Sequence, residues 1–121
     1  IKTVIFSDDI DSPAQNFSDN FVYGKYDDET KINEFLEKID LVTFEFENIP
    51  YLTLNRINQI KKVLPKPKVN QIVQNRLFEK YFVNKINIRT TLSVSVKNDK
   101  DLKSNVKLLP GILKTCTLGS A

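Results

Sequence analysis

The sequence predicts an α/β fold built around a parallel sheet. Residues 2–6 and 41–44 are short apolar runs rich in β-branched and aromatic residues, which is typical of buried strands. Between them, four apolar residues recur at the spacing of one helix face: Ile32, Phe35, Leu36 and Ile39. A strand, a helix and a second strand in this order favour a crossover between parallel strands.

Two further elements precede that helix. Residues 10–20 are polar and include Ser12-Pro13, so we expect a loop with about one helical turn. Residues 21–23 should form a second brief strand. The acidic residues 27–29 at the start of the helix and Lys38 at its end both suit the helix dipole.

A second helix should follow the strand at 41–44. Asn48 is available as its N-cap, and Pro50 is tolerated in its first turn. The helix should end before Pro65, because proline interrupts helical hydrogen bonding. Its apolar face consists of Leu54, Ile57, Ile60 and Leu64.

The proline-rich stretch at 65–68 marks a domain border, since a residue before proline is driven towards extended geometry. We therefore expect one domain at 1–66 and a second at 67–121. In the second we expect a helix over 69–85, two short extended pieces within 86–96, a helix over 99–108 and a strand at 112–115.

Composition narrows the classes of function. The 121 residues contain no histidine, which excludes imidazole-based catalysis within this stretch. The single cysteine, Cys116, cannot form an internal disulfide, and we expect a buried, inert thiol in a reducing setting. No apolar run approaches the roughly 20 residues that span a bilayer, so we expect a soluble, cytoplasmic protein without a membrane partner.

The charge is weak support for nucleic-acid binding. The 18 basic and 15 acidic side chains give a net charge of +3 and a pI near 9.0. The basic residues at 61–68 lack the interleaved aromatic residues that would stack on bases. We interpret them as a solvated surface run and expect no nucleic-acid partner.

Glu45 and Glu47 follow the strand at 41–44, at the edge of a parallel sheet where ligands bind. If extended geometry persists, both carboxylates point to one side and can accept a hydrogen bond from a substrate amine or bind a cation. A solvated loop is an equally good interpretation of the pair.

Three cationic residues in the second half are candidates for an anion site. Arg76 and Lys80 lie at i and i+4 of a predicted helix, where an anion would offset their repulsion, although two separately hydrated side chains are the simpler interpretation. Lys114 interrupts an apolar strand, so it needs either a partner such as phosphate or an outward position on an edge strand.

Asp8 and Asp9 form an acidic pair directly after the first predicted strand. Two carboxylates there could bind a metal ion. The sequence Ser-Asp-Asp is also ordinary turn chemistry, and we favour the turn.

Four stretches, taken together, resemble a known family. Residues 40–50 read Asp-Leu-Val-Thr-Phe-Glu-Phe-Glu-Asn-Ile-Pro, and the others are Asp11-Ser-Pro-Ala14, Gln74-Asn-Arg-Leu-Phe-Glu-Lys80 and Pro110-Gly-Ile-Leu-Lys-Thr115. In order and spacing they are similar to the ATP-dependent carboxyaminoimidazole ribonucleotide synthetases. These ATP-grasp ligases are the ATPase component of phosphoribosylaminoimidazole carboxylase in purine synthesis. The resemblance covers essentially all of this sequence but only the middle of the family's first half.

The resemblance implies a fold and a chemistry. The fold is a parallel Rossmann-like pre-ATP-grasp sheet at 1–66 that lacks its first strand and helix, followed by linker helices and the start of an ATP-grasp domain at 67–121. The cofactors are ATP and Mg²⁺, with the magnesium ligands outside this sequence. The substrates are aminoimidazole ribonucleotide and bicarbonate, joined through carboxyphosphate. A homodimer is one possible assembly.

The resemblance also assigns roles to single residues. By position, Arg76 and Lys114 match ATP-contacting residues of the family, and Glu45 matches the acidic residue that faces the substrate amine. Where the family continues from Leu118-Gly119 into a glycine-rich loop over the phosphates, this sequence has Ser120-Ala121. We therefore expect these residues to be part of an enzyme and not to turn over alone.

A receiver-like phosphoacceptor signalling domain is the alternative from another class. That fold also places an acidic pair after its first strand, an acidic residue after a middle strand and a lysine near a late strand. It needs an aspartate as phosphoacceptor, whereas position 45 is glutamate, and it leaves residues 74–80 unexplained.

Overall fold

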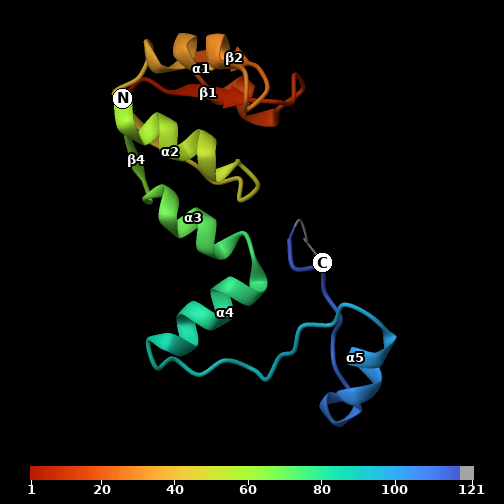
Figure 1. The fold of residues 1–121 in the computed structure, drawn as a ribbon. Coiled ribbons are helices and arrows are strands. Elements are labelled where there is room, and N and C mark those ends of the chain that lie inside the picture. Colours follow the sequence, from red (N-terminus) through yellow and green to blue (C-terminus); the bar gives the residue numbers. More distant parts are fainter. Residues whose placement is uncertain (118–121) are drawn as a thin grey trace. The chain divides into compact units, whose positions relative to one another are not determined.

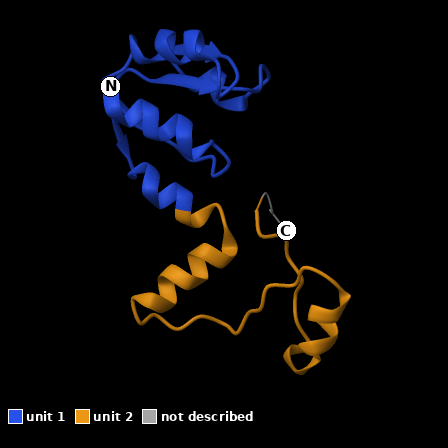
Figure 2. Cartoon of the chain, viewed as in Figure 1, with its two compact units in different colours: residues 1–71 blue, residues 72–121 orange. Residues whose placement is uncertain are grey.

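The computed structural model describes residues 1–117 (Figure 1). The chain divides into two compact units, residues 1–71 and 72–121 (Figure 2). The domain border placed at residue 66 stays a prediction. The sequence pattern at Leu118-Gly119 and Ser120-Ala121 lies outside the described residues.

The first unit opens with a parallel pair of strands. Strand β1 (Val4–Ser7) pairs with strand β2 (Asn20–Tyr23), with Ile5 opposite Phe21. The loop between them contains the 3-10 helix η1 (Pro13–Phe17), which begins at a proline whose fixed φ suits a first helical position. Both predicted strands and the single helical turn between them are confirmed.

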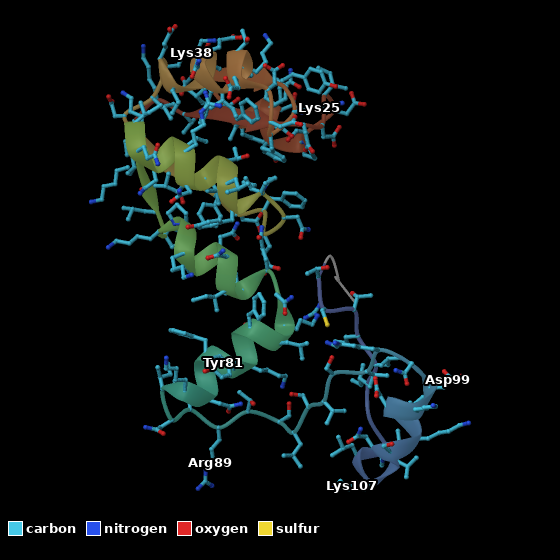
Figure 3. The ribbon with its side chains drawn as sticks, viewed as in Figure 1. Lys25, Lys38, Tyr81, Arg89, Asp99 and Lys107 are labelled. Carbon is cyan, nitrogen blue, oxygen red and sulfur yellow. The ribbon has the colours of Figure 1, made fainter. Side chains whose placement is uncertain are left out.

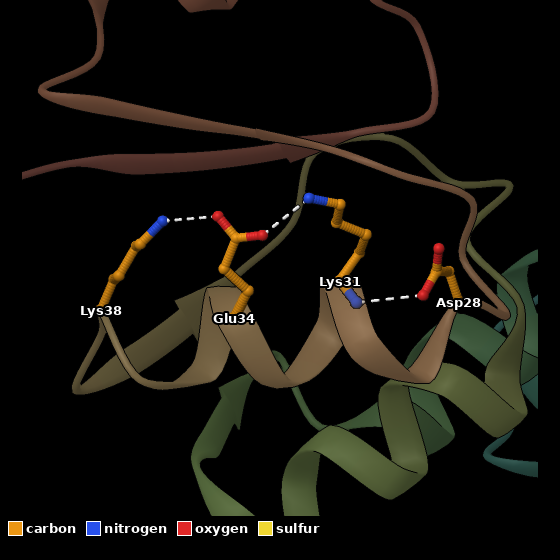
Figure 4. A network of polar contacts seen from close by, with 4 residues as sticks. All are labelled: Asp28, Lys31, Glu34 and Lys38. Atoms are coloured by element: carbon orange, nitrogen blue, oxygen red, sulfur yellow. Dashed lines mark hydrogen bonds and ion pairs between the residues drawn. The ribbon is translucent and has the colours of Figure 1, made fainter.

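Helix α1 (Glu29–Leu36) begins after Asp28, whose carboxylate accepts a hydrogen bond from the main-chain N–H of Lys31. The helix buries three residues of the predicted apolar face: Ile32, Phe35 and Leu36. On its outer side the Glu34 carboxylate lies 2.8 Å from the Nζ atoms of both Lys31 and Lys38 (Figure 4).

A second parallel pair completes the strands of the described residues. Strand β3 (Leu41–Thr43) leads into helix α2 (Tyr51–Ile60), which returns to strand β4 (Lys62–Leu64). β3 and β4 are parallel, with Val42 directly opposite Val63. The strand predicted at 41–44 and the helix predicted after it are therefore confirmed, whereas β4 was not predicted.

The core of the first unit draws on both strand pairs and both long helices. Its buried residues are Val22, Ile32, Phe35, Leu36, Val42, Leu54, Ile57 and Val63. Polar contacts at the edge of the core join α2 to α1 and to the segment before it. The Thr53 hydroxyl donates to the carbonyl of Tyr26 at 2.6 Å, and Arg56 forms an ion pair with Glu29 at 2.6 Å.

The two strand pairs remain separate sheets within the described residues. β1 pairs with β2 and β3 with β4, so one edge of β1 and one edge of β3 carry no strand. A cavity of about 430 Å³ is lined by residues of both strands and by core side chains of α1 and α2. This arrangement is the one expected of a parallel sheet that lacks one strand.

Two details of the second predicted helix are wrong. Leu64 belongs to β4, because Lys61 turns to extended geometry and the N–H of Val63 donates to Oδ1 of Asn58. Val63 is fully buried opposite a second valine, and this β-branched pair outweighs the helical spacing. The N-cap position is occupied by Pro50 and not by Asn48.

The second half of the chain is helical where the structure assigns regular elements. Helix α3 (Pro67–Val73) is followed by α4 (Arg76–Lys85), α5 (Asp99–Ser104) and the 3-10 helix η2 (Val106–Leu108). The single helix predicted over 69–85 is wrong, because the chain is extended at Asn75, whose side chain caps a new helix. The helix predicted over 99–108 is confirmed in its first six residues only.

The strand predicted at 112–115 is wrong, since no strand of the described residues includes it. The extended pieces predicted within 86–96 also lie outside the strands. A strand needs a neighbouring strand to pair with, and no strand pairing among the described residues involves either segment. Their apolar side chains are exposed, as at Leu92 and Ile112, and Arg89 extends away from the segment after α4 (Figure 3). Cys116, expected to be buried, is exposed as well. Among the helices of residues 1–117, none has the length and apolar character needed to cross a bilayer.

Candidate functional site

The cavity of the first unit lies between the unpaired edges of β1 and β3. Its walls are mostly apolar and include Phe6, Phe44 and Leu54, as expected where a further strand would pack against the sheet. Polar side chains also line it: Asp8, Asp9, Ser12 and Glu45 follow the ends of β1 and β3, and Tyr26 and Thr53 are contributed by the segments around α1 and α2. The carboxyl ends of parallel strands are where open α/β sheets bind ligands, so the polar end of the cavity is the candidate site.

Glu45 lines this cavity, whereas its neighbour Glu47 is not part of the lining. β3 ends at Thr43, and a turn starts at position 47, so extended geometry does not continue through both glutamates. The condition under which the two carboxylates were expected to share one side is therefore not met. Glu45 is exposed, which keeps its carboxylate available to a ligand.

The acidic pair after β1 forms a turn, as the sequence favours. The main-chain N–H of Asp9 donates to Oγ of Ser7 at 3.1 Å, and Oδ1 of Asp9 accepts from the N–H of Asp11 at 3.0 Å. These are the local bonds that make aspartate a turn residue. Within residues 1–117 no group of three or more cysteine, aspartate or glutamate side chains could hold a metal ion.

Tyr26 is a cavity residue that sequence reasoning missed. Burial raises the pKa of its phenol, and the negative charge of Asp8 together with a hydrogen bond to it raises the pKa further. The phenol therefore stays protonated and remains a hydrogen-bond donor. No local pattern could have identified it, because Tyr26 meets Asp8 only through the pairing of β1 with β2.

Asn70 fixes the loop that carries Glu45. It is fully buried on α3, and its Nδ2 donates to the carbonyl of Ile49 at 3.0 Å, near the end of that loop. Its Oδ1 has no hydrogen-bond partner among the described residues. A buried amide that anchors a loop from another element restricts how far the loop can move.

Arg76 begins helix α4, and it contacts a segment far along the chain. Its Nε donates to the carbonyl of Thr115 at 3.1 Å, and its main-chain N–H donates to the carbonyl of Cys116 at 2.9 Å. Lys114 is the residue directly before Thr115. Two of the three cationic residues singled out from the sequence, Arg76 and Lys114, are therefore carried on chain segments that contact each other in the second unit.

Lys114 itself is exposed and lies outside any strand. The interpretation of an outward lysine on an edge strand is thus wrong, since the edge strand is absent from the described residues. The side chain of Lys80 contacts a different segment from that of Arg76, because its Nζ donates to the carbonyl and the hydroxyl of Thr91. Lys80 is accounted for by this contact within the chain.

The structure places Glu45 in the first unit and Arg76 and Lys114 in the second. Their convergence on one site stays a prediction. Sequence reasoning also missed Asn75, which sets the start of α4. An asparagine directly before an apolar helical run is a known N-cap signature and could have identified it.

A family model described as the ribonucleotide synthetase preATP-grasp domain matches residues 1–74. A bifunctional purine synthesis protein of Dictyostelium discoideum is 32% identical over 120 residues, which are 98% of this chain and 12% of that protein. An N5-carboxyaminoimidazole ribonucleotide synthase of Staphylococcus haemolyticus is 33% identical over 116 residues, which are 94% of this chain and 31% of that protein.

Solved structures agree with these sequence matches. The N5-carboxyaminoimidazole synthetase of Staphylococcus aureus in complex with ADP superposes with a TM-score of 0.81 at 29% identity, over 98% of this chain and 33% of that one. The synthetase of Thermus thermophilus gives a TM-score of 0.79 at 27% identity, over 88% and 29%. The chain thus spans a third or less of the relatives it matches.

Proposed function

Because the chain belongs to the ribonucleotide synthetase preATP-grasp family, we propose that it is part of an ATP-grasp ligase that carboxylates aminoimidazole ribonucleotide in purine biosynthesis. Relatives that match nearly its whole length are named for this product, and one of them was solved with ADP. The matches to the family model and to these relatives support this proposal over the alternative of a receiver-like signalling domain.

The reaction joins bicarbonate to the exocyclic amine of the nucleotide. A bicarbonate oxygen attacks the γ-phosphorus of ATP, which forms carboxyphosphate and releases ADP. The amine nitrogen then bonds to the carboxyl carbon as the C–O bond to phosphate breaks, and the amine loses one proton. ATP, when bound, supplies the phosphoryl group that makes the carboxyl carbon reactive.

The observation that carries the proposal in the first unit is the position of Glu45 on an apolar cavity. A carboxylate is a strong acceptor for an N–H donor, since a hydrogen bond to a charged group contributes about 1.5–3 kcal/mol. Glu45 would hold the substrate amine in place.

In the second unit, Arg76 and Lys114 are the residues that would hold the phosphates of ATP. Their chemistry fits the group, because a guanidinium is always charged and matches phosphate oxygens in pairs, and an ammonium adds a point charge. Such cations stabilise the charge that moves between phosphate oxygens during transfer. The Mg²⁺ that accompanies ATP would be bound by residues outside this sequence, as the family resemblance implies.

The test is ATP hydrolysis by the protein that carries this chain, with each co-substrate left out in turn. We expect ADP to form only when bicarbonate and aminoimidazole ribonucleotide are both present. If ADP forms at the same rate without aminoimidazole ribonucleotide, the proposed substrate is wrong. Residues 1–121 alone, checked by intact mass, should form no product.

A further inference from the structure

The hydrogen bonding of the first turn of helix α4 is completed by a segment that lies about forty residues later in the sequence. The first N–H groups of any helix lack partners within the helix. Oδ1 of Asn75 accepts from the N–H groups of Leu77 and Phe78, at 3.0 and 3.2 Å. The remaining N–H of the first turn, that of Arg76, donates to the carbonyl of Cys116.

The side chain of Arg76 adds a second bond to the same segment. Its Nε donates to the carbonyl of Thr115, so one residue binds two successive carbonyls. Two bonds from one residue to neighbouring peptide groups fix the direction of both carbonyls and hence the local path of the chain. Arg76 is half-buried, whereas Lys114, Thr115 and Cys116 are exposed.

No helix or strand of the described residues includes residues 111–117. The main chain beneath Lys114 therefore depends on contacts with other elements for its position. Losing the Arg76 side chain would remove one of these contacts next to Lys114 and would leave Lys114 more freedom of movement. A flexible cation binds a phosphate less well than one held in place, since its entropy must be lost on binding.

We propose that Arg76 is a positioning residue for Lys114, in addition to carrying charge, because its Nε and main-chain N–H fasten residues 115–116 to the start of α4. The part of this inference that concerns the nucleotide rests on the proposed function. The fastening itself rests on the two hydrogen bonds alone. The two parts are separated by measuring them with different methods.

Arg76→Gln and Arg76→Ala separate position from charge. The amide nitrogen of glutamine is the same number of bonds from Cα as Nε of arginine, so Arg76→Gln keeps a donor for Thr115 and loses the charge. Arg76→Ala loses both. Lys85→Ala, in the last turn of the same helix, is the control for removing a cation from α4.

The first measurement is the backbone order parameter of residues 111–117, from ¹⁵N relaxation, in the protein that carries this chain and without nucleotide. We expect the order parameters of residues 114–116 to fall in Arg76→Ala, towards the values below about 0.6 that mark flexible backbone, and to stay near the original values in Arg76→Gln and Lys85→Ala. Unchanged order parameters in Arg76→Ala would overturn the fastening. An equal fall in Arg76→Gln would overturn it too, because charge alone would then explain the result.

The second measurement is the affinity for ADP in Arg76→Ala, Lys114→Ala and the double variant. If Arg76 acts partly through Lys114, the double variant should lose clearly less affinity than the product of the two single losses. Losses that multiply within about twofold would overturn the positioning of Lys114. If the order parameters respond as expected but the original protein binds no ADP, the fastening stands and the proposed function fails.

Discussion

The side chain of Asn70 on α3 donates a hydrogen bond to the main-chain carbonyl of Ile49, which precedes α2. Asn70 is fully buried, so its side-chain amide depends on hydrogen-bond partners within the chain. It links the loop that carries Glu45 to a helix some twenty residues further along the chain. The geometry of the candidate site therefore depends on a residue that does not itself line the cavity.

Replacing this anchor should weaken the fold measurably. Asn70→Ala removes the donor and leaves a small void, so we expect the free energy of unfolding to fall by about 1–3 kcal/mol in urea. Asn16→Ala, at an exposed asparagine of η1, should change it by less than about 0.5 kcal/mol. Equal effects of the two substitutions would contradict the anchoring role.

Helix α2 offers a matched pair of leucines for testing the core. Leu54 is 1% exposed and Leu52 is 77% exposed. Leu54→Ala should destabilise the chain by about 2–5 kcal/mol, through lost burial and the cavity left behind. Leu52→Ala should cost less than about 0.5 kcal/mol. Denaturant unfolding followed by circular dichroism measures the free energy of unfolding of both variants. If Leu52→Ala lowers it as much as Leu54→Ala does, α2 packs with its other face inwards.

The helical and strand elements of the first unit were predictable because their apolar residues carry the signal locally. The face of α1, for example, is set by Ile32, Phe35 and Leu36, which the helix buries as predicted. β4 was not predictable from the same kind of pattern. Val63 joins a strand because it pairs with Val42, and that partner lies about twenty residues away in the sequence.

The candidate site was predictable only in part for the same reason. Glu45 could be placed at a sheet edge from its position after β3, but the turn that separates it from Glu47 depends on the path towards α2. The contact of Tyr26 with Asp8 and the bond from Asn70 to Ile49 join distant segments. Local periodicity holds no information about such contacts.

The hydroxyl of Thr53 donates to the carbonyl of Tyr26 at 2.6 Å, which ties α2 to the residues before α1. Thr53→Val keeps the shape and removes the donor, so the partly buried carbonyl loses its bond. We expect the free energy of unfolding in urea to fall by about 1–3 kcal/mol. The control is Thr30→Val, at an exposed threonine of α1, which should have little effect. The role assigned to the hydroxyl is wrong if both variants behave alike.

Hydrogen bonds from Lys31 and Lys38 lower the pKa of Glu34 from its ordinary value of 4.5 to about 2. A carboxyl whose pKa is lower in the folded state stabilises that state above the unfolded pKa, and the contribution is lost as the pH falls through the folded pKa. The contribution of Glu34 to the free energy of unfolding should thus be complete above pH 4.5 and should disappear as the pH falls towards 2. Carboxyl chemical shifts followed by NMR should give a midpoint near 2, and this midpoint should rise in Lys31→Ala. A midpoint at 4.5 in the original chain would mean that the ion pairs do not persist in solution.

Glu45 and Glu47 provide the comparison that bears most directly on function, because they are chemically identical, two positions apart, and only Glu45 lines the cavity. Glu45→Gln keeps the size of the side chain and removes the charge that would attract the substrate amine. In the protein that carries this chain, we expect kcat/KM for aminoimidazole ribonucleotide to fall about 10- to 100-fold, the worth of one hydrogen bond to a charged group. Glu47→Gln should change it by less than about threefold, since its carboxylate is not part of the cavity lining. The ADP affinity should stay unchanged in Glu45→Gln, because the amine and the nucleotide are separate ligands. A loss of activity in Glu47→Gln that equals the loss in Glu45→Gln would move the substrate contact away from the cavity.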